Sequence, residues 1–598
     1  MKKNQLSLIC AIAALVALPL TSIPSSSADT QTPTATESQM PQGPDESKPI
    51  MTYCDPDMYA CNGYVAASDE QYLPPFAPGF RNYQGIYHND LAGIYRFGSY
   101  AINIVRDSSG QATSVTACKD IAGPECAGTE NHFAADLPLC SSAITIDCLR
   151  DITITDADNK PLAFTIEGEF PKGNPQSFTG SAALKVPNGA APTLIHIPGA
   201  PHKGGDTYLV KAEMVANKNE GNPEFGLQSF VASISAVKII DGKFAFGGVS
   251  TNADLYRKGF TQIGNEKGTY PSKCAIASAT QCAERYALPL GIHYGMTVDL
   301  SRKITGWLHG RVRSPQVDVS TNQAGGSTIK ILAEAIKIPI NAAWVSNDSA
   351  AQTIKDFYAG KSNYGSPLFG NQNKSKPLSE IALLRDANYG HNQETLNEYL
   401  AWLTTLGDKA QAMPTAWVVQ TMTNYDVADQ IRKCLNQVDS LAGIVTTNAA
   451  EYLDGPPTYD KSSGSLDYKV AATHFEPDGT TVFKGSYDLV MNSKVARCIY
   501  GFTQAPISAT VSVTSEAGTP SVATTVVNEK NGWLSLGAYN FTYSTPTIRV
   551  KLTQEAAQAE SVAAPTQVLK KTITCVKGKV KKRISGSNPK CPTGFKKS

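Results

Sequence analysis

The chain has 598 residues and a formal net charge of +1, with 41% hydrophobic and 18% charged residues. This length is enough for about two to four domains with sizeable cores. Beyond the N-terminus no apolar stretch is long enough to cross a bilayer as a helix, which excludes a transmembrane segment from the mature chain.

The N-terminus has the pattern of a secretory signal. Two lysines precede an apolar run over residues 6–20, and small residues follow up to Ala28. The pattern predicts a signal peptide at 1–28 and a secreted protein, either extracellular or at the cell surface. Residues 29–50 are rich in Thr, Ser and Pro, which predicts a disordered linker.

Export changes the expected state of the cysteines. Of the 13 cysteines, Cys10 leaves with the signal peptide, and an even number in an oxidising compartment predicts disulfides. Nearest-neighbour pairing is the simplest arrangement, although the sequence allows others. It joins Cys54 to Cys61, Cys118 to Cys126, Cys140 to Cys148, Cys274 to Cys282, Cys434 to Cys498, and Cys575 to Cys591. No CxxC and no zinc-finger spacing occurs, so we expect no metal.

Residues 51–345 are mostly short runs of β-forming residues between Gly, Pro and Asn. They predict a β-rich N-terminal region of one or two domains. The clearest predicted strands are 152–154, 162–166, 193–197, 207–215, 229–240, 296–300 and 328–340.

One predicted strand of this region has the most function-like pattern. Trp307, His309, Arg311 and Arg313 would share one face, because successive side chains of a strand alternate. An aromatic ring beside cations could stack on a sugar or meet an anionic ligand, which makes these four residues candidate ligand-binding residues. The alternative is a solvated strand face in which the arginine stems shelter Trp307.

No catalytic motif is present. The sequence lacks GxSxG and HExxH, and His202 and Asp206 flank two glycines in a predicted loop. The acidic turn from Asp156 to Asp158 has the start of a calcium loop, but a proline replaces its turn glycine, which favours an ordinary turn. We therefore name no catalytic residue and no cofactor.

Between residues 346 and 436 the apolar spacing changes to a helical period. Helices are predicted at 349–358, at 393–406 and around 427–435. We expect this helical segment to pack on the neighbouring strands or to connect the two β regions.

Residues 437–554 predict a β-sandwich of immunoglobulin-like type. Between 507 and 515, Ile, Ala and Val alternate with Ser and Thr, and turn residues separate about seven such runs. Ala496, Cys498, Tyr500 and Phe502 are predicted to share one face of a strand. The fold class is therefore mainly β and multidomain.

Residues 555–569 form a second predicted linker, and 570–598 form a basic tail with nine lysines, one arginine and no acidic residue. The Cys575–Cys591 pair would close a small loop, with a hairpin turning near 585–589. Such charge attracts anionic cell-envelope polymers or surface glycans, whereas an exported protein seldom meets nucleic acid. The alternative is a solvated tail with no partner. The cations expected to contact the envelope are Lys577, Lys579, Lys581, Lys582, Arg583, Lys590, Lys596 and Lys597.

The sequence ITCVKGK…NPKCPTGFKK is similar to the C-terminal tail of exported surface proteins of actinobacterial type. The segment from Cys434 to Gln554, with VARCIYGFTQAPISATVSV, resembles a module of such proteins, so the resemblance covers about the last quarter of the chain. It implies an exported surface protein and supplies no catalytic residues. Together these observations predict a non-catalytic, envelope-associated protein, with an extracellular hydrolase or a glycan-binding protein as alternatives.

Overall fold

The computed structural model describes the chain in segments, and the two predicted linkers, the signal peptide and the Cys54–Cys61 pair lie outside them. The described residues are 83–88, 98–174, 176–242, 274–339, 341–346, 350–358, 384–386, 393–410, 413–422, 429–453, 455–502, 507–514, 520–521, 524–543, 547–554, 571–586 and 588–598.

Strands dominate the part of the chain up to residue 346. They are β1 (Tyr83–His88), β2 (Tyr100–Arg106), β3 (Ala112–Ala117), β4 (Glu130–Asp136), β5 (Cys148–Thr155), β6 (Thr165–Glu169), β7 (Thr193–His196), β8 (Thr207–Asn219), β9 (Asn222–Asp241), β10 (Cys274–Ala277), β11 (Gln281–Tyr286), β12 (His293–Leu300), β13 (Gly306–Arg311), β14 (Arg313–Thr321), β15 (Ser327–Glu334), β16 (Ile336–Lys337) and β17 (Asn341–Ser346), with one 3-10 turn, η5 (Pro124–Cys126). The predicted β-rich character of this region is confirmed.

The remainder mixes short helices with further strands. They are α3 (Gln352–Tyr358), β18 (Leu384–Asp386), α4 (Gln393–Trp402), β19 (Thr415–Ala416), β20 (Val418–Thr421), α5 (Asp429–Leu435), β21 (Leu441–Thr447), β22 (Glu451–Tyr452), β23 (Thr458–Asp460), β24 (Ser465–Ala471), β25 (Lys484–Asn492), α6 (Ser493–Tyr500), β26 (Ile507–Thr514), β27 (Pro520–Ser521), β28 (Thr524–Lys530), β29 (Trp533–Thr542), β30 (Thr547–Gln554), β31 (Lys571–Lys577), β32 (Val580–Gly586) and β33 (Lys596–Lys597). The predicted helices at 349–358, 393–406 and 427–435 correspond to α3, α4 and α5.

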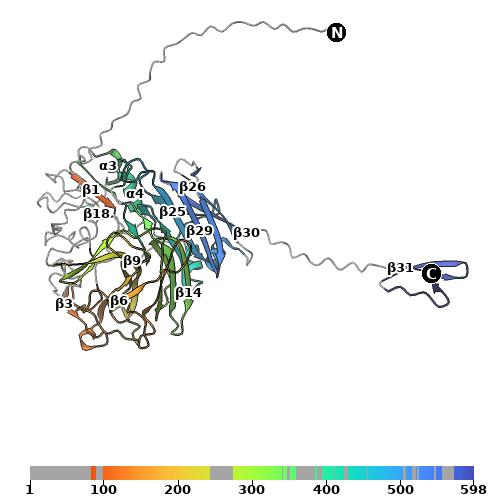
Figure 1. The fold of residues 1–598 in the computed structure, drawn as a ribbon, viewed down its shortest axis with the longest axis horizontal. Coiled ribbons are helices and arrows are strands. Elements are labelled where there is room, and N and C mark those ends of the chain that lie inside the picture. Colours follow the sequence, from red (N-terminus) through yellow and green to blue (C-terminus); the bar gives the residue numbers. More distant parts are fainter. Residues whose placement is uncertain are drawn as a thin grey trace, which may run out of the picture.

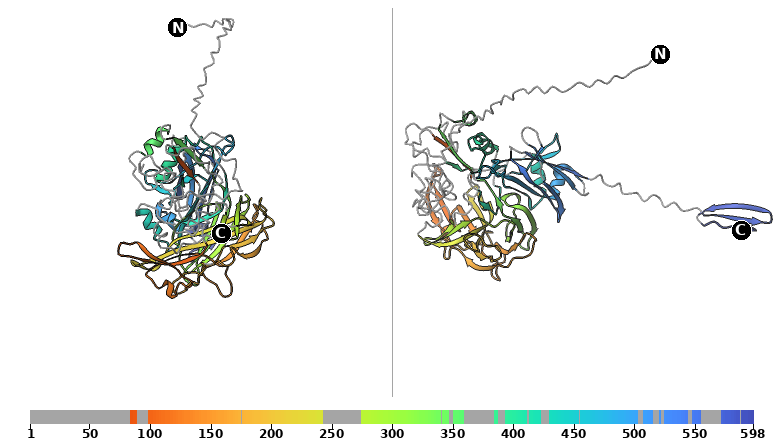
Figure 2. Two further views of the ribbon diagram at one scale, coloured as in Figure 1. Left: turned by 90° about the vertical axis from the view of Figure 1, so that its left-hand side faces the viewer. Right: turned by 45° about the horizontal axis from the view of Figure 1, so that its top comes forward.

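The largest sheet in the described part of the chain has 15 strands and draws on both ends of the sequence (Figure 1). Its main path is β28-β29-β25-β21-β13-β20-β9-β8-β4-β2-β3. The junction is β13, which pairs antiparallel with β20 and parallel with β21. The orange-to-yellow strands and the blue strands therefore form adjoining parts of one body (Figure 2).

A four-stranded sheet, β14-β15-β12-β5, contributes to the first of two large apolar cores. Phe133 and Ile234 of the large sheet lie in one cluster with Tyr294 and Ile329 of the smaller sheet, and all four are buried. We call this cluster core A. Each such side chain contributes roughly 1.5–3 kcal/mol by leaving water.

A six-stranded sheet contributes to the second core. Its path is β22-β24-β30-β26-β27, with β23 paired to β24. Leu489 and Leu536 of the large sheet cluster with Tyr468 and Ile548 of this sheet and with Trp402 of α4. We call this cluster core B. The fold is mainly β and multidomain, as predicted, and the immunoglobulin-like assignment stays a prediction.

The segment around Cys498 corrects the prediction of a strand. It is the helix α6, in which Val495, Ala496 and Ile499 are the buried apolar residues. The Asn492 side chain accepts a hydrogen bond from Lys494 N at 2.9 Å and so caps the first turn. The helix ends at Gly501, whose φ of +66° is the left-handed backbone of a C-terminal cap.

Five of the six predicted disulfides lie within the described residues and are confirmed. They are Cys118–Cys126, Cys140–Cys148, Cys274–Cys282, Cys434–Cys498 and Cys575–Cys591. Four of the five join cysteines close in sequence. Cys434–Cys498 has a sequence separation of 64 and joins α5 to α6.

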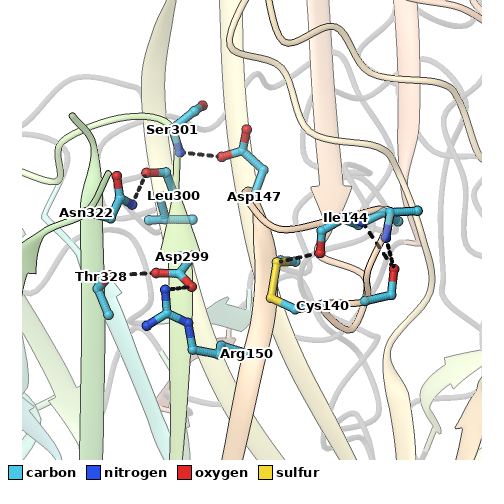
Figure 3. Close-up of a disulfide and its surroundings, with 12 residues drawn as sticks. Cys140, Ile144, Asp147, Arg150, Asp299, Leu300, Ser301, Asn322 and Thr328 are labelled. Atoms are coloured by element: carbon cyan, nitrogen blue, oxygen red, sulfur yellow. Dashed lines mark hydrogen bonds and ion pairs between the residues drawn. A yellow bond between two sulfur atoms is a disulfide. The ribbon is translucent and has the colours of Figure 1, made fainter. Parts of the chain in front are cut away.

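Polar contacts beside Cys140–Cys148 fix the start of β5 to its neighbours (Figure 3). Ser301 N donates to Asp147 Oδ1 at 2.7 Å. Arg150 forms an ion pair with Asp299, which also accepts a hydrogen bond from Thr328. The disulfide loop is therefore held to the end of β12 and the start of β15. In the described parts of the chain, no helix is both long and apolar enough to cross a membrane.

Candidate functional site

The tail is a three-stranded antiparallel sheet in the order β32-β31-β33. Lys577 pairs with Val580, so Gly578 and Lys579 form the hairpin turn between β31 and β32. Gly578 has a φ of +58°, which suits a tight two-residue hairpin. The predicted turn near 585–589 is wrong, because Ser585 lies within β32 opposite Thr572.

One face of this small sheet is covered by the tail itself. Cys575 points to that face, is fully buried and is bonded to Cys591. Lys582 is directly opposite Cys575 and therefore shares its face. Lys582 Nζ lies 5.5 Å from the centre of the Phe595 ring. The segment from Cys591 to Phe595 consequently lies over this side of the sheet.

The opposite face is open and cationic. Val576 is directly opposite Lys581 on one side and Lys596 on the other. Arg583 follows Lys581 by two residues in β32, so its side chain points to the same face. All three cations are exposed. We call Lys581, Arg583 and Lys596 the open cationic face.

The spacing of a β-sheet sets the spacing of these charges. Neighbouring strands lie about 5 Å apart, and alternate residues of one strand lie about 7 Å apart. Lys581 and Arg583 are thus anchored about 7 Å apart, within one Debye length of about 8 Å at physiological salt, so their fields add. Lys596 lies on the other side of β31, about two strand spacings or roughly 10 Å from Lys581, so its field is partly screened from theirs. The other predicted envelope contacts lie off this face, in the turn, on the covered side or in the return segment: Lys577, Lys579, Lys582, Lys590 and Lys597.

The predicted strand around Trp307 has the expected alternation but is buried. Trp307 contributes to core B, whereas Leu308 and Val312 contribute to core A. Trp307 is 2% exposed and His309 is 5% exposed, so this conformation presents neither ring to a glycan in solvent. The face is not solvated either, and ligand binding at these residues stays a prediction.

Arg311 holds the corner where the chain leaves the large sheet for the six-stranded sheet. Its guanidinium donates to the carbonyl oxygens of Thr447 at 2.9 Å, Ala449 at 2.5 Å and Ala450 at 3.3 Å. It also lies 4.3 Å from the centre of the Tyr452 ring. Burial lowers the pKa of Arg311. These contacts give the buried cation a structural role at the corner between β21 and β22.

Arg313 is separated from the other three residues because the chain changes sheets at Val312. Its guanidinium lies 4.7 Å from the centre of the Tyr539 ring. Ser314 has a φ of +51°, and its N–H donates to Asp488 Oδ2 at 3.1 Å. The Tyr539 hydroxyl donates to the other carboxyl oxygen of Asp488. Burial raises the pKa of Asp488 to about 7.

The histidines and acids considered for catalysis serve local structure. His202 Nδ1 accepts from Gly204 N at 3.1 Å, and its Nε2 lies 2.9 Å from Thr207 O. Asp206 contacts His196 at 3.2 Å instead of His202. Both ring nitrogens of His202 are therefore engaged by backbone groups of its own loop, and among the described residues no carboxylate hydrogen-bonds to the ring.

The acidic turn is an ordinary Asx turn. Asp156 Oδ1 accepts from the N–H groups of Asp158 and Lys160, each at 2.9 Å. Glu167 is at the twelfth position counted from Asp156, where a calcium loop places its closing carboxylate. It instead contacts His196 Nε2 at 3.1 Å. Within the segments that the structure describes, no group of three or more His, Cys, Asp or Glu residues could hold a metal ion.

Two buried polar sites were not predicted from the sequence. One is Asp488 with Tyr539, and the other is Lys211 with Asp136 and Glu213. The sequence contains a signal for the second site, because Lys211 and Glu213 interrupt an apolar run in the predicted strand 207–215. Asp488 stands between Tyr487 and Leu489, where strand alternation predicts a solvated position, so the sequence contains no comparable signal.

Comparisons of the chain with protein families, with curated proteins and with solved structures find no match.

Proposed function

We propose that the protein is exported and retained at the cell envelope by its tail, and that its β-rich body is non-catalytic. The observation that carries the proposal is the open cationic face of Lys581, Arg583 and Lys596. The resemblance of the tail to those of exported actinobacterial surface proteins supports the same compartment. The disulfides also fit an oxidising environment.

The disulfide makes the tail suitable for this role. The tail has too little apolar surface for a core of its own, and a crosslink that closes a loop of this size contributes about 3 kcal/mol in the chain-entropy model. It therefore holds the three cations in a fixed arrangement. Preorganised charges bind a polyanion with a smaller entropy loss than charges on a free chain.

Sedimentation with purified envelopes tests the proposal. The mature protein should pellet with envelopes at low salt and be released as salt rises, since exposed charges are screened. Removing residues 570–598 should abolish pelleting. Equal pelleting of the truncated protein would place the anchor in the body and contradict the proposal.

A matched pair of triple variants tests the open face itself. The first replaces Lys581, Arg583 and Lys596 by glutamine, and the second replaces Lys571, Lys579 and Lys590 by glutamine. Both remove the same charge. We expect the first to lose more than tenfold in envelope affinity and the second to lose a few-fold. Equal losses would show that net charge alone, and not this face, retains the protein.

A further inference from the structure

Lys211 is a charged residue inside the large sheet. It lies in β8 between Val210 and Ala212, both of which contribute to core A. Its side chain is only 4% exposed and shares the face of Leu209, which packs in an apolar cluster with Phe170. An ammonium group in such a place is costly unless it is paired.

Two carboxyl groups meet this amine. Glu213 Oε2 lies 2.8 Å from Lys211 Nζ, and Asp136 Oδ1 lies 3.5 Å from it. Asp136 ends β4 directly opposite Glu213 in β8, and its side chain is 1% exposed. Neither carboxyl oxygen of Asp136 makes a hydrogen bond of normal geometry to any described group. An amine and a poorly solvated carboxyl group are thus held together, with a second carboxyl beside them.

We propose that Lys211 and Asp136 condense to an intramolecular amide bond, with Glu213 as the proton acceptor, which crosslinks β8 to β4. This proposal concerns the body and does not depend on the function proposed for the tail.

The reaction balances in atoms and charge. Glu213 takes one proton from the Lys211 ammonium group, and the amine lone pair attacks Cγ of the neutral Asp136 carboxylic acid. The N–C bond forms, the bond from Cγ to the acid hydroxyl breaks, and the hydroxyl leaves as water with a second proton from Nζ. The products are a neutral amide, one water molecule and the neutral acid form of Glu213.

The site favours the reactive protonation states. Burial raises the pKa of Asp136 to about 7, so its acid form is populated near neutral pH. Burial alone would lower the pKa of Lys211, but the charges of Asp136 and Glu213 raise it, so the amine is freed by transfer to Glu213. Lys211 Nζ lies 3.5 Å from Asp136 Oδ1, so the amine is already in contact with the carboxyl group that it would attack. Holding two reacting groups together in this way lowers the entropic part of the barrier. The neutral product also removes charges from a region of low dielectric.

Intact mass spectrometry of the full chain tests the proposal directly. The protein is purified, reduced and alkylated, so that disulfides do not affect its mass. We expect its mass to be lower by one water molecule than the sequence requires. A tryptic digest should join the peptides 120–150 and 204–218, because trypsin cannot cleave after an amidated Lys211. The full calculated mass would overturn the proposal.

Substitutions locate the bond. Asp136→Ala and Glu213→Gln should restore the full calculated mass of each variant. Asp136→Asn should end at the mass of the unsubstituted protein, because asparagine loses ammonia where aspartate loses water. A mass difference between these two proteins would overturn the assignment of Asp136 as the acceptor.

An exposed ion pair provides the matched control. Lys303 and Asp439 also form a contact, but their side chains are 35% and 77% exposed, so water competes for both groups. Asp439→Ala should keep the deficit of one water molecule. Loss of that deficit in this control, or its persistence in Asp136→Ala, would place the condensation elsewhere and overturn the proposal.

Discussion

In the body, side chains from three sheets fill cores A and B, whereas within the described residues of the tail only Cys575 is buried. The body buries polar groups such as Arg311, which depend on partners within the protein because water cannot reach them. The tail leaves its cations in solvent and depends on one crosslink. Charge therefore has a structural role in the body, while in the tail it is available to a partner.

The largest expected effect tests the structural role of charge in the body. Arg311→Met keeps the apolar stem but leaves the carbonyls of Thr447, Ala449 and Ala450 without their donor. At roughly 1–3 kcal/mol for each unsatisfied group, we expect a loss of about 5 kcal/mol in the free energy of unfolding, measured by urea denaturation. Arg313→Met, which removes a half-buried cation, is the control and should cost about 1 kcal/mol. Equal losses would contradict a special role for Arg311.

The second prediction concerns the pH dependence of the body. The folded pKa of Asp488 is about 7, above its ordinary value of 3.8, so the folded state binds more protons between these values. Stability should therefore fall as pH rises from about 4 to about 7 and be level above it, by up to about 4 kcal/mol at about 1.4 kcal/mol per unit. Asp488→Asn should remove this slope.

Denaturation of the parent and variant at several pH values measures that difference. Asp439→Asn is the control, because its carboxyl is exposed and its removal should leave the slope intact. An unchanged slope in Asp488→Asn would show that Asp488 is ionised in the folded protein at low pH.

The smallest expected effect concerns the stability of the tail, which depends on its one disulfide. Cys591→Ser should cost the tail about 3 kcal/mol and unfold it, because burial there cannot replace the crosslink. The thermal unfolding of the body should be unchanged. Amide hydrogen exchange reports on both regions, and the protection of β31 and β32 should disappear. Protected amides in these strands would mean that the sheet is stable without its disulfide. Lys590→Ser, at the neighbouring position, should retain protection.

Local patterns predicted much of the fold, because they depend on neighbouring residues. Alternation placed Trp307, His309 and Arg311 on one face of a strand, and nearest-neighbour pairing gave every disulfide in the described residues. The error at Cys498 came from applying strand alternation to a segment that begins with a helix cap. Asn492 is that cap, and the spacing of Val495, Ala496 and Ile499 is helical.

The burial of the predicted site could not be read from the sequence. The His309 ring contacts the Tyr452 hydroxyl at a sequence separation of 143, and Arg311 meets Thr447 at a separation of 136. Such partners are brought together by sheet topology, which strand patterns do not specify. The sequence predicted a basic tail but not the open cationic face. Which cations share a side of the sheet is decided by the register of β31 with β32 and β33, and the composition of the tail does not specify that register.

The position of β13 has a consequence for the order in which the molecule can be built. This strand is synthesised well before β21, yet the two are adjacent in the large sheet. Until the ribosome has made Leu441–Thr447, one edge of β13 has no native neighbour, and Trp307 lacks the core B residues from Ala442 onward. Assembly of the body is thus necessarily a late event in biosynthesis, and no cut between β13 and β21 can yield two complete halves.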